Sequence, residues 1–424
     1  MSKHNWKRVT VWALYDWANS AYATTVMAGF FPLFFKQYWS ATADVTVSTF
    51  QLGSANSCAS LIVALFAPVL GAIADAGGVK KKFLFFFALM GIVMTGSLSL
   101  VAQGNCLTAI GIYILATIGF SAGNIFYDAL IIDAAPTERI DFVSALGYAL
   151  GYLGGGLLFL VNVAMIMKPQ VFGLTDATEA VRVSFLCVAL WWALFSIPIF
   201  LFLREAPPAQ AIASRNIVKN GFRQILDTMR EIRRLRVIGL FLLAYFMYID
   251  GVHTVIRMAV DYGMSIGLKG QSLMVALLIT QFVGFPAAIL FGRIGERWGA
   301  KTGIFIGIGV YLFVTVWGSS MSTEKEFLIL AITVGMVQGG VQALSRSFYT
   351  RIIPKFKAAE FFGFYNMLGK FAAIIGPFLM GWVSLLTGNA RYSILSLGLL
   401  FVSGALILSL VDEKKGRLAA LSLQ

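Results

Sequence analysis

Charged residues, histidines and cysteines are scarce in this 424-residue sequence, and each scarcity excludes a class of function. Only 12% of the residues are charged, against 58% that are hydrophobic, which is too apolar for an ordinary soluble domain. The two histidines and three cysteines have no metal-ligand or redox spacing. No glycine-rich phosphate loop for ATP is found. The sequence therefore predicts neither an enzyme nor an ATP-driven pump, and no metal or organic cofactor.

Long apolar segments recur from end to end, each about 20 residues and thus long enough to cross a bilayer as a helix. The first carries Asp16 and lacks a small-residue cleavage site, so we expect a span and not a signal peptide. We place twelve spans at residues 10–35, 50–74, 83–102, 107–132, 142–166, 182–203, 237–260, 272–292, 302–321, 326–350, 361–386 and 392–411.

One short motif, G-x3-[DE]-x2-G-x-K, occurs twice, each time directly after a hydrophobic segment. The second copy lies 221 positions after the first, and a repeat at half the chain length predicts two similar halves. The copies consist of Gly71, Asp75, Gly78 and Lys80, and of Gly292, Glu296, Gly299 and Lys301. We expect an all-α integral membrane protein of twelve helices in two pseudo-symmetric six-helix bundles, residues 1–203 and 237–424, joined by a linker at 204–236.

The net charge of +13 follows the membrane topology and is not one basic patch. Of the 33 lysines and arginines, 24 fall on the side of the twelve-span arrangement that holds both termini and 6 on the other. This bias predicts that both termini are cytoplasmic, and it excludes a nucleic-acid partner. Apolar residues at helical spacing between basic ones at 218–236 predict an amphipathic helix on the anionic inner leaflet, as an anchor or as a regulatory element.

Four further segments are distinctive, and they are distributed over nearly the whole chain. They are Trp12–Ser20, Ser144–Gly156, Gly339–Ser347 and Glu360–Gly363. Together with the repeated loop motif, they resemble the autophagy-related vacuolar amino-acid effluxer family and its bacterial relatives, within the major facilitator superfamily. The resemblance implies secondary transport by alternating access, amino acids as a candidate substrate class, a monomer and a bacterial inner membrane.

We interpret the two loop motifs as conformational latches and not as binding sites, because their glycines permit tight turns and their acids can lie near a helix N-terminus. The superfamily usually has an arginine after the acid. The second copy has it in Arg297, whereas Ala76 occupies the equivalent position of the first copy.

Ionisable residues inside the spans cost roughly 2.5–3.5 kcal/mol each at mid-bilayer, so each requires a reason. Apart from Arg182 and Glu326, the first residues of spans 6 and 10, they fall in spans 1, 4, 7, 10 and 11, and none falls inside spans 3, 6, 9 or 12. In the superfamily, spans 1, 4, 7 and 10 line a central cavity, so the charges mark the expected pathway. These residues are Asp16, Asp128, Asp250, His253, Arg257, Arg346 and Lys370.

Asp250, His253 and Arg257 share one helix face, because they are spaced i, i+3 and i+7. Histidine titrates near neutral pH, so this ladder is our candidate carrier of a coupling proton. No cofactor is expected, and the proton would be the coupling ion. A static, self-neutralising charge ladder is the alternative.

Asp128 and Arg346 occupy equivalent positions in the two halves. Three interpretations are open: a cytoplasmic gate between the halves, direct binding of a substrate ammonium and carboxylate, or pairing of each residue within its own half.

The remaining candidates surround these charges. Asp16 with Asn19, Tyr22 and Tyr127 would suit an ammonium group, or would form a buried network that ties the first span to the fifth. Lys370, after Asn366, would suit a carboxylate. A balanced set of acids and bases favours a small zwitterion, most simply an amino acid. The alternatives are an exporter of amphipathic compounds and a substrate sensor that does not transport.

Overall fold

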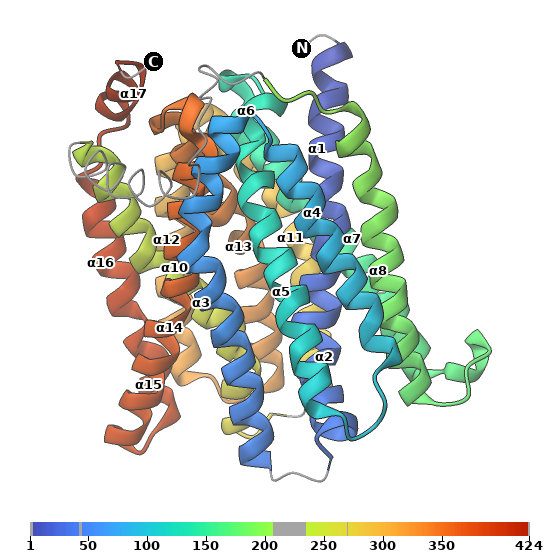
Figure 1. Ribbon diagram of the computed structural model, residues 1–424. Coiled ribbons are helices and arrows are strands. Elements are labelled where there is room, and N and C mark those ends of the chain that lie inside the picture. Colours follow the sequence, from blue (N-terminus) through green and yellow to red (C-terminus); the bar gives the residue numbers. More distant parts are fainter. Residues whose placement is uncertain (1–2, 42–44, 207–234, 269, 423–424) are drawn as a thin grey trace.

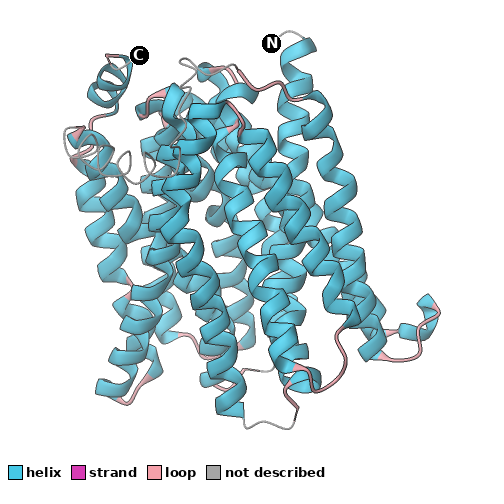
Figure 2. Cartoon of the chain, in the orientation of Figure 1, coloured by secondary structure: helices cyan, strands magenta, loops and turns pink. Residues whose placement is uncertain are grey.

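The computed structural model describes all residues except 1–2, 42–44, 207–234, 269 and 423–424. Throughout these described residues the chain forms helices joined by short loops, and it contains no strand (Figure 2). Most helices are long and run roughly parallel to one another through the molecule (Figure 1). The predicted amphipathic helix at 218–236 lies almost entirely outside the described residues.

The first half crosses the bundle six times. Its first crossing is α1 followed by two π-helical segments, η1 and η2, with the short α-helix α2 between them, and it ends at Trp39. The bounds are α1 (Lys3–Ala21), η1 (Tyr22–Phe30), α2 (Phe31–Phe34), η2 (Phe35–Trp39), α3 (Val45–Gly77), α4 (Lys80–Ser97), η3 (Leu98–Leu100), α5 (Cys106–Ala129), α6 (Ile131–Ala134), η4 (Thr137–Arg139), α7 (Ile140–Met167), η5 (Pro169–Phe172) and α8 (Ala177–Phe202).

The second half repeats this order. Local capping defines several helix starts: Thr323 and Glu326 form a capping box at the start of α13, and Asp412 caps α17. The bounds are α10 (Arg236–Ser265), α11 (Gly270–Trp298), α12 (Ala300–Ser320), α13 (Glu324–Ile352), η6 (Lys355–Lys357), α14 (Ala358–Thr387), α15 (Ala390–Ser396), α16 (Gly398–Ser409) and α17 (Glu413–Leu421).

The prediction of twelve spans is confirmed. In the described part of the chain, 11 helices are long and apolar enough to cross a membrane. The first crossing, from α1 to η2, overlaps the remaining predicted span; it is divided into α- and π-helical pieces and carries Lys7 and Arg8 near its start. The last crossing is made by α15 and α16 in succession.

Both chain ends lie at the same end of the helix bundle (Figure 1). We call this end the terminal face and the other end the opposite face. Helices α1, α4, α7, α10, α12 and α14 begin at the terminal face, whereas α3, α5, α8, α11 and α13 end there. Depth in the bundle can therefore be followed from residue numbers, at 1.5 Å per helical residue.

The two halves contact each other mainly where α3 packs on α14 and α7 packs on α11. Both contacts depend on glycine near the terminal face. A Cβ on Gly363 of α14 would lie 2.6 Å from the carbonyl oxygen of Ala67 in α3, and one on Gly292 of α11 would lie 2.6 Å from the Cβ of Ala145 in α7. The backbones thus approach more closely than side chains would allow.

Candidate functional site

Asp128 and Arg346 meet across the boundary between the halves, close to the terminal face. Asp128 lies one residue before the end of α5 and Arg346 lies six before the end of α13. The guanidinium donates to Asp128 Oδ1 at 2.9 Å, and only 2% of the Arg346 side chain is exposed. Of the three interpretations, this geometry excludes pairing within each half for the conformation described.

Arg346 is held on all sides by the first half. Its Nε donates to the Ser144 hydroxyl at 2.9 Å and a terminal nitrogen donates to the Ser144 carbonyl at 2.8 Å. Its cationic plane lies 4.9 Å from the ring centre of Trp12 and 4.5 Å from that of Tyr148. Charge-assisted hydrogen bonds and cation–π contacts of this kind compensate for the desolvation of a buried guanidinium.

Asp128 is bonded on its other oxygen as well, since Asn366 of α14 donates to Oδ2 at 3.2 Å. Trp12 donates its indole N–H to the Tyr127 carbonyl at 2.9 Å, and the two rings stack. Five helices thus converge in one polar cross-section, which we call the Arg346 layer. Its members are Trp12, Tyr127, Asp128, Ser144, Tyr148, Arg346 and Asn366.

Asp16 and Lys370 lie one helical turn beyond the Arg346 layer, toward the opposite face. Asp16 follows Trp12 by four residues on α1 and Lys370 follows Asn366 by four on α14, which places each about 6 Å further into the bundle. The Asp16 carboxylate accepts long hydrogen bonds from Ser20 at 3.3 Å and Tyr127 at 3.4 Å. Lys370 donates to the Ser121 hydroxyl at 2.9 Å. Both side chains are only partly buried.

The side chains of Asn19 and Tyr22 do not face a substrate pathway as predicted. Both are almost fully buried. The Asn19 amide donates to Asn124 at 2.6 Å, and the Tyr22 hydroxyl is 2.9 Å from that of Thr117. Because the i, i+3 spacing puts both on one face of the first crossing, they fasten it to α5. The buried network predicted as the alternative tied the first span to the fifth, residues 142–166, whereas the bonds of these two residues go to α5, the fourth span.

The predicted ladder on α10 has no bond between its members. Asp250 is fully buried; its Oδ1 accepts from the Gly376 N–H at 3.0 Å, beside Pro377 in α14, and from Thr254 at 3.4 Å. Among the described residues, His253 Nδ1 is buried without a partner. Arg257 makes no hydrogen bond or ion pair to any described residue, and its side chain is exposed. The structure thus turns Asp250 into α14 and leaves Arg257 free.

In the first latch motif, Asp75 forms a hydrogen bond that joins the two halves. Its Oδ2 accepts from the backbone N–H of Glu360 at 2.9 Å, at the start of α14, and Lys80 lies 3.4 Å from Oδ1. This is the position where a helix N-terminus favours a carboxylate. Gly78 has a φ of 56°, which permits the turn into α4.

Asp133, in the short helix α6 near this latch, lies 4.0 Å from the Lys80 ammonium and accepts a hydrogen bond from the Ala206 N–H. Burial raises the pKa of this carboxyl, and Lys80 opposes the shift.

The second motif also joins the two halves, but its acid pairs with a side chain and not with a backbone N–H. Glu296 forms a two-oxygen pair with Arg139, at 3.1 and 3.2 Å. Arg139 immediately precedes α7, the counterpart of α14 in the first half. Arg297, the expected basic partner, is exposed and forms no hydrogen bond or ion pair with any described residue, so the structure does not place it in the latch.

The lysines of the two motifs are equivalent in sequence but not in structure. Lys301 donates to the carbonyls of Ser409 and Val411 at the end of α16, at 3.0 and 2.7 Å. In the first half this role belongs to Lys81, which donates to Phe200 and Leu203 at the end of α8. Both lysines are the second residue of their helix, and a cation suits the carbonyl end of a helix.

Inter-half bonds are confined to one part of the molecule. Among the described residues they lie near the terminal face or, at the deepest, at mid-bundle, as in the 2.9 Å bonds from Lys370 to Ser121 and from Gln338 to Tyr152. A further ion pair, between Asp141 of α7 and Arg351 of α13, also binds Glu413 of α17. Among the described residues, the polar bonds that join the halves are therefore concentrated toward the terminal face.

Three members of the Arg346 layer were not among the candidates: Trp12, Ser144 and Tyr148. Their sequence segments could have indicated them, because Trp12 begins the first of the four distinctive segments, and Ser144 and Tyr148 lie in the second. No charge marked them, so a search for ionisable groups did not find them. Ser121, the partner of Lys370, carried no such signal.

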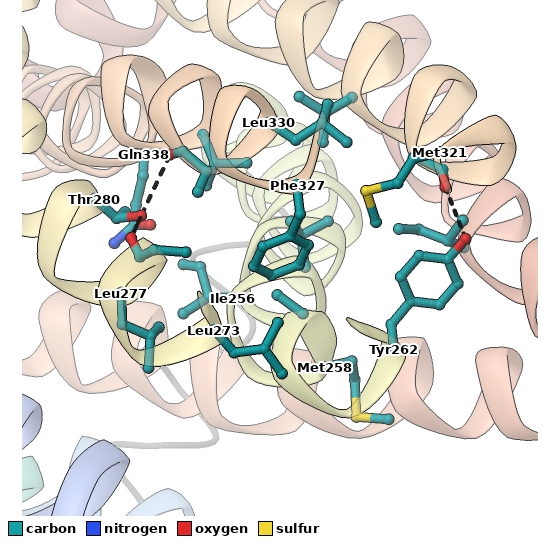
Figure 3. A pocket seen from close by; sticks show the side chains of 18 of the residues that line it. Ile256, Met258, Tyr262, Leu273, Leu277, Thr280, Met321, Phe327, Leu330 and Gln338 are labelled. Carbon is teal, nitrogen blue, oxygen red and sulfur yellow. Dashed lines mark hydrogen bonds between the residues drawn. The ribbon is translucent and has the colours of Figure 1, made fainter. Parts of the chain in front are cut away.

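A separate cavity of about 100 Å³ lies within the second half, among α10 to α15 (Figure 3). Its wall is almost entirely apolar, with Leu273, Phe327 and Leu330 in contact with it. Thr280 and Gln338 provide polar groups at one end, and at the other Tyr262 donates to the Gly318 carbonyl at 2.7 Å.

Two half-bundles, related by a repeated motif and meeting at a charged central layer, define a transporter of the major facilitator type. Solved structures agree in fold. The fucose transporter FucP in the outward conformation aligns with a TM-score of 0.72 at 12% identity over 96% of this chain and 98% of that one. The human organic anion transporter MFSD10 aligns with 0.74 at 13% identity, over 96% and 100%.

Sequence comparison identifies the family. The model described as "Vacuole effluxer Atg22 like" matches residues 4–133 and 132–421, and the chain belongs to this family. An uncharacterised MFS-type transporter of Bacillus subtilis, YxiO, is 41% identical over 98% of this chain and 97% of its own length. Autophagy-related protein 22 of Yarrowia lipolytica is 25% identical over 65% of this chain, which spans about half of that protein's length. The chain is thus a multi-pass membrane protein of a transporter family.

Proposed function

We propose that the protein is a secondary active transporter that moves a small zwitterionic metabolite, most simply an amino acid, by alternating access, and that this transport is coupled to protons. The terminal face is placed in the cytoplasm, because 24 of the 33 basic residues fall on that side. In a bacterial cell this corresponds to the inner membrane. The described conformation is then outward-facing.

One observation supports this proposal above the others. Directly beyond the sealed Arg346 layer, the first half presents a carboxylate, Asp16, and the second half presents an ammonium, Lys370, at the same depth. A zwitterion placed between them would contact both halves at once. Substrate binding of this kind can pull the halves together, which is the step that alternating access requires.

Uptake into proteoliposomes is the direct test. With purified protein and an inward proton gradient, we expect radiolabelled amino acids to accumulate, and Asp16→Asn to reduce uptake at least tenfold because the ammonium loses its counter-charge. Asp176→Asn, at an exposed helix cap on the opposite face, is the matched control. Absence of uptake or exchange for every amino acid tested would contradict the proposal.

Proton coupling is assigned to the α10 segment that holds His253. Its Nδ1 is buried without a described partner, so a proton gained there would not displace an existing hydrogen bond, and histidine is the usual carrier near neutral pH. We expect His253→Gln to abolish accumulation driven by a pH gradient but to preserve exchange of substrate across the membrane. Unchanged pH-driven accumulation in this variant would exclude His253 as the carrier.

The apolar cavity of the second half favours one alternative, export of amphipathic compounds. Its volume of about 100 Å³ would hold a small apolar group, and its polar end at Thr280 and Gln338 would bind a head group. A bulky substitution, Ala276→Phe, would fill this space. Loss of transport of hydrophobic compounds with retention of amino-acid exchange would assign the cavity to a second class of substrate.

A further inference from the structure

The pathway contains more positive charge than its own acids neutralise. Asp128 and Arg346 cancel each other in a buried pair. Asp250 is fully buried and turned into α14, where it bonds Gly376. Its described partners are the Gly376 N–H and the Thr254 hydroxyl, and it forms no ion pair with Arg257. Among the side chains that the structure describes, the charged groups left to face the pathway are therefore one carboxylate, Asp16, and two cations, Lys370 and Arg257.

The two cations follow one another along the pathway. Lys370 lies 12 residues after the start of α14, and Arg257 lies 21 residues after the start of α10. Both helices begin at the terminal face (Figure 1), and nine further residues at 1.5 Å each correspond to about 14 Å of depth. Arg257 thus lies nearer the opposite face.

Neither cation has a partner that would justify its place in the membrane. Among the described residues, no carboxylate lies within ion-pair distance of either, and Arg257 makes no hydrogen bond. Cationic side chains inside a bilayer ordinarily pair with an acid or line a water-filled path. Two unpaired cations at successive depths are the arrangement expected where a bound molecule supplies both anionic groups.

We propose that Arg257 and Lys370 form a two-anion subsite, so that the transported molecule is an amino acid with two carboxylates and one ammonium. Lys370 binds the α-carboxylate and Asp16 the ammonium, since these two side chains share one depth. Arg257 binds the second carboxylate, nearer the opposite face. This inference rests on the proposed function and narrows its substrate to the acidic amino acids.

Calorimetric titration of the purified full chain tests how many charged groups of the ligand the site binds. The ligands compared differ from one another by one charged group. L-Glutamate and L-glutamine have the same shape, but only glutamate carries the second carboxylate, and glutarate lacks the ammonium. We expect glutamate to bind at least tenfold more tightly than either. Equal affinity for glutamate and glutamine overturns the two-anion subsite, and equal affinity for glutarate overturns the role of Asp16 within it.

Variants separate the two cations. Arg257→Gln is expected to remove the preference for glutamate and to leave glutamine binding within about threefold, whereas Lys370→Met weakens both ligands. Arg257→Lys should retain the preference. The matched controls, Arg293→Gln and Lys325→Met, alter exposed side chains without described partners and should bind as wild type does. A preference that survives Arg257→Gln contradicts the assignment of Arg257.

The outcomes also distinguish this inference from the proposed function. If neutral amino acids bind and are transported as well as glutamate, the two-anion subsite is wrong and zwitterion transport stands. If no amino acid binds or moves, the proposed function itself fails. The wild-type ratio of glutamate to glutamine affinity decides the inference even where a variant does not fold.

Discussion

Exchanging the two charges of the central pair, as Asp128→Arg together with Arg346→Asp, is expected to restore part of the transport that each single substitution abolishes. Each single change leaves two like charges buried face to face. Breaking a buried pair costs about 3–5 kcal/mol, which corresponds to more than about a hundredfold in an equilibrium. The exchange recreates an ion pair between α5 and α13. Initial uptake rates in proteoliposomes provide the measurement.

Recovery should be partial, because the first half is built around a guanidinium at Arg346. An aspartate there cannot donate to Ser144 or lie over the Trp12 ring. Arg293→Asp, the same change at an exposed site, should transport normally. If the double variant is no more active than the single variants, the pair is not simply a gate, and direct contact with substrate becomes the better explanation.

A valine at Gly363 is expected to prevent the terminal face from closing. The new side chain would meet the backbone of α3, 2.6 Å from the Ala67 carbonyl and 2.7 Å from the Pro68 Cα, and a backbone cannot rotate away as a side chain can. Overpacking of this kind costs about 1–3 kcal/mol, which shifts a two-state equilibrium about 5- to 150-fold. Transport should fall accordingly.

The trapped state is measured by cysteine labelling. In a background without native cysteines, Ser144→Cys lies within the closed terminal side and should react with an impermeant maleimide only when that side opens. Gly363→Val should increase its labelling rate. Gly53→Val is the matched control, because a Cβ on Gly53 of α3 meets nothing within 4 Å. Equal labelling rates in the two variants would show that the α3–α14 crossing does not control closure.

The number and order of the spans could be predicted because hydrophobic length does not depend on how a helix is rotated. Segment 237–260 lies within α10 and segment 361–386 within α14. The ends were less accurate, and α10 continues five residues beyond its predicted end, to Ser265. Helices extend past their apolar cores because polar end residues can still form backbone hydrogen bonds in the interfacial region.

The contacts of individual side chains depend on rotation and register, which composition does not determine. Asn19 and Tyr22 lie next to Asp16 in sequence, yet they face α5 and are buried there. Lys80 and Lys301 match in spacing, but α4 begins at Lys80 whereas α12 begins one residue before Lys301. A shift of one residue, about 100° around a helix axis, gives the two lysines different partners.

The two latches consequently differ in their response to electrolyte. Asp75 accepts its inter-half bond from a backbone N–H in a buried setting, where mobile ions have little access. The Arg139 side chain opposite Glu296 is 56% exposed, and ion pairs of this type weaken as the Debye length shortens with salt. Ionic strength thus weakens the contact between α7 and α11 more than the pseudo-symmetric contact between α3 and α14. Raised salt in the solution that bathes the terminal face would favour separation at the α7–α11 contact while the α3–α14 contact remains intact.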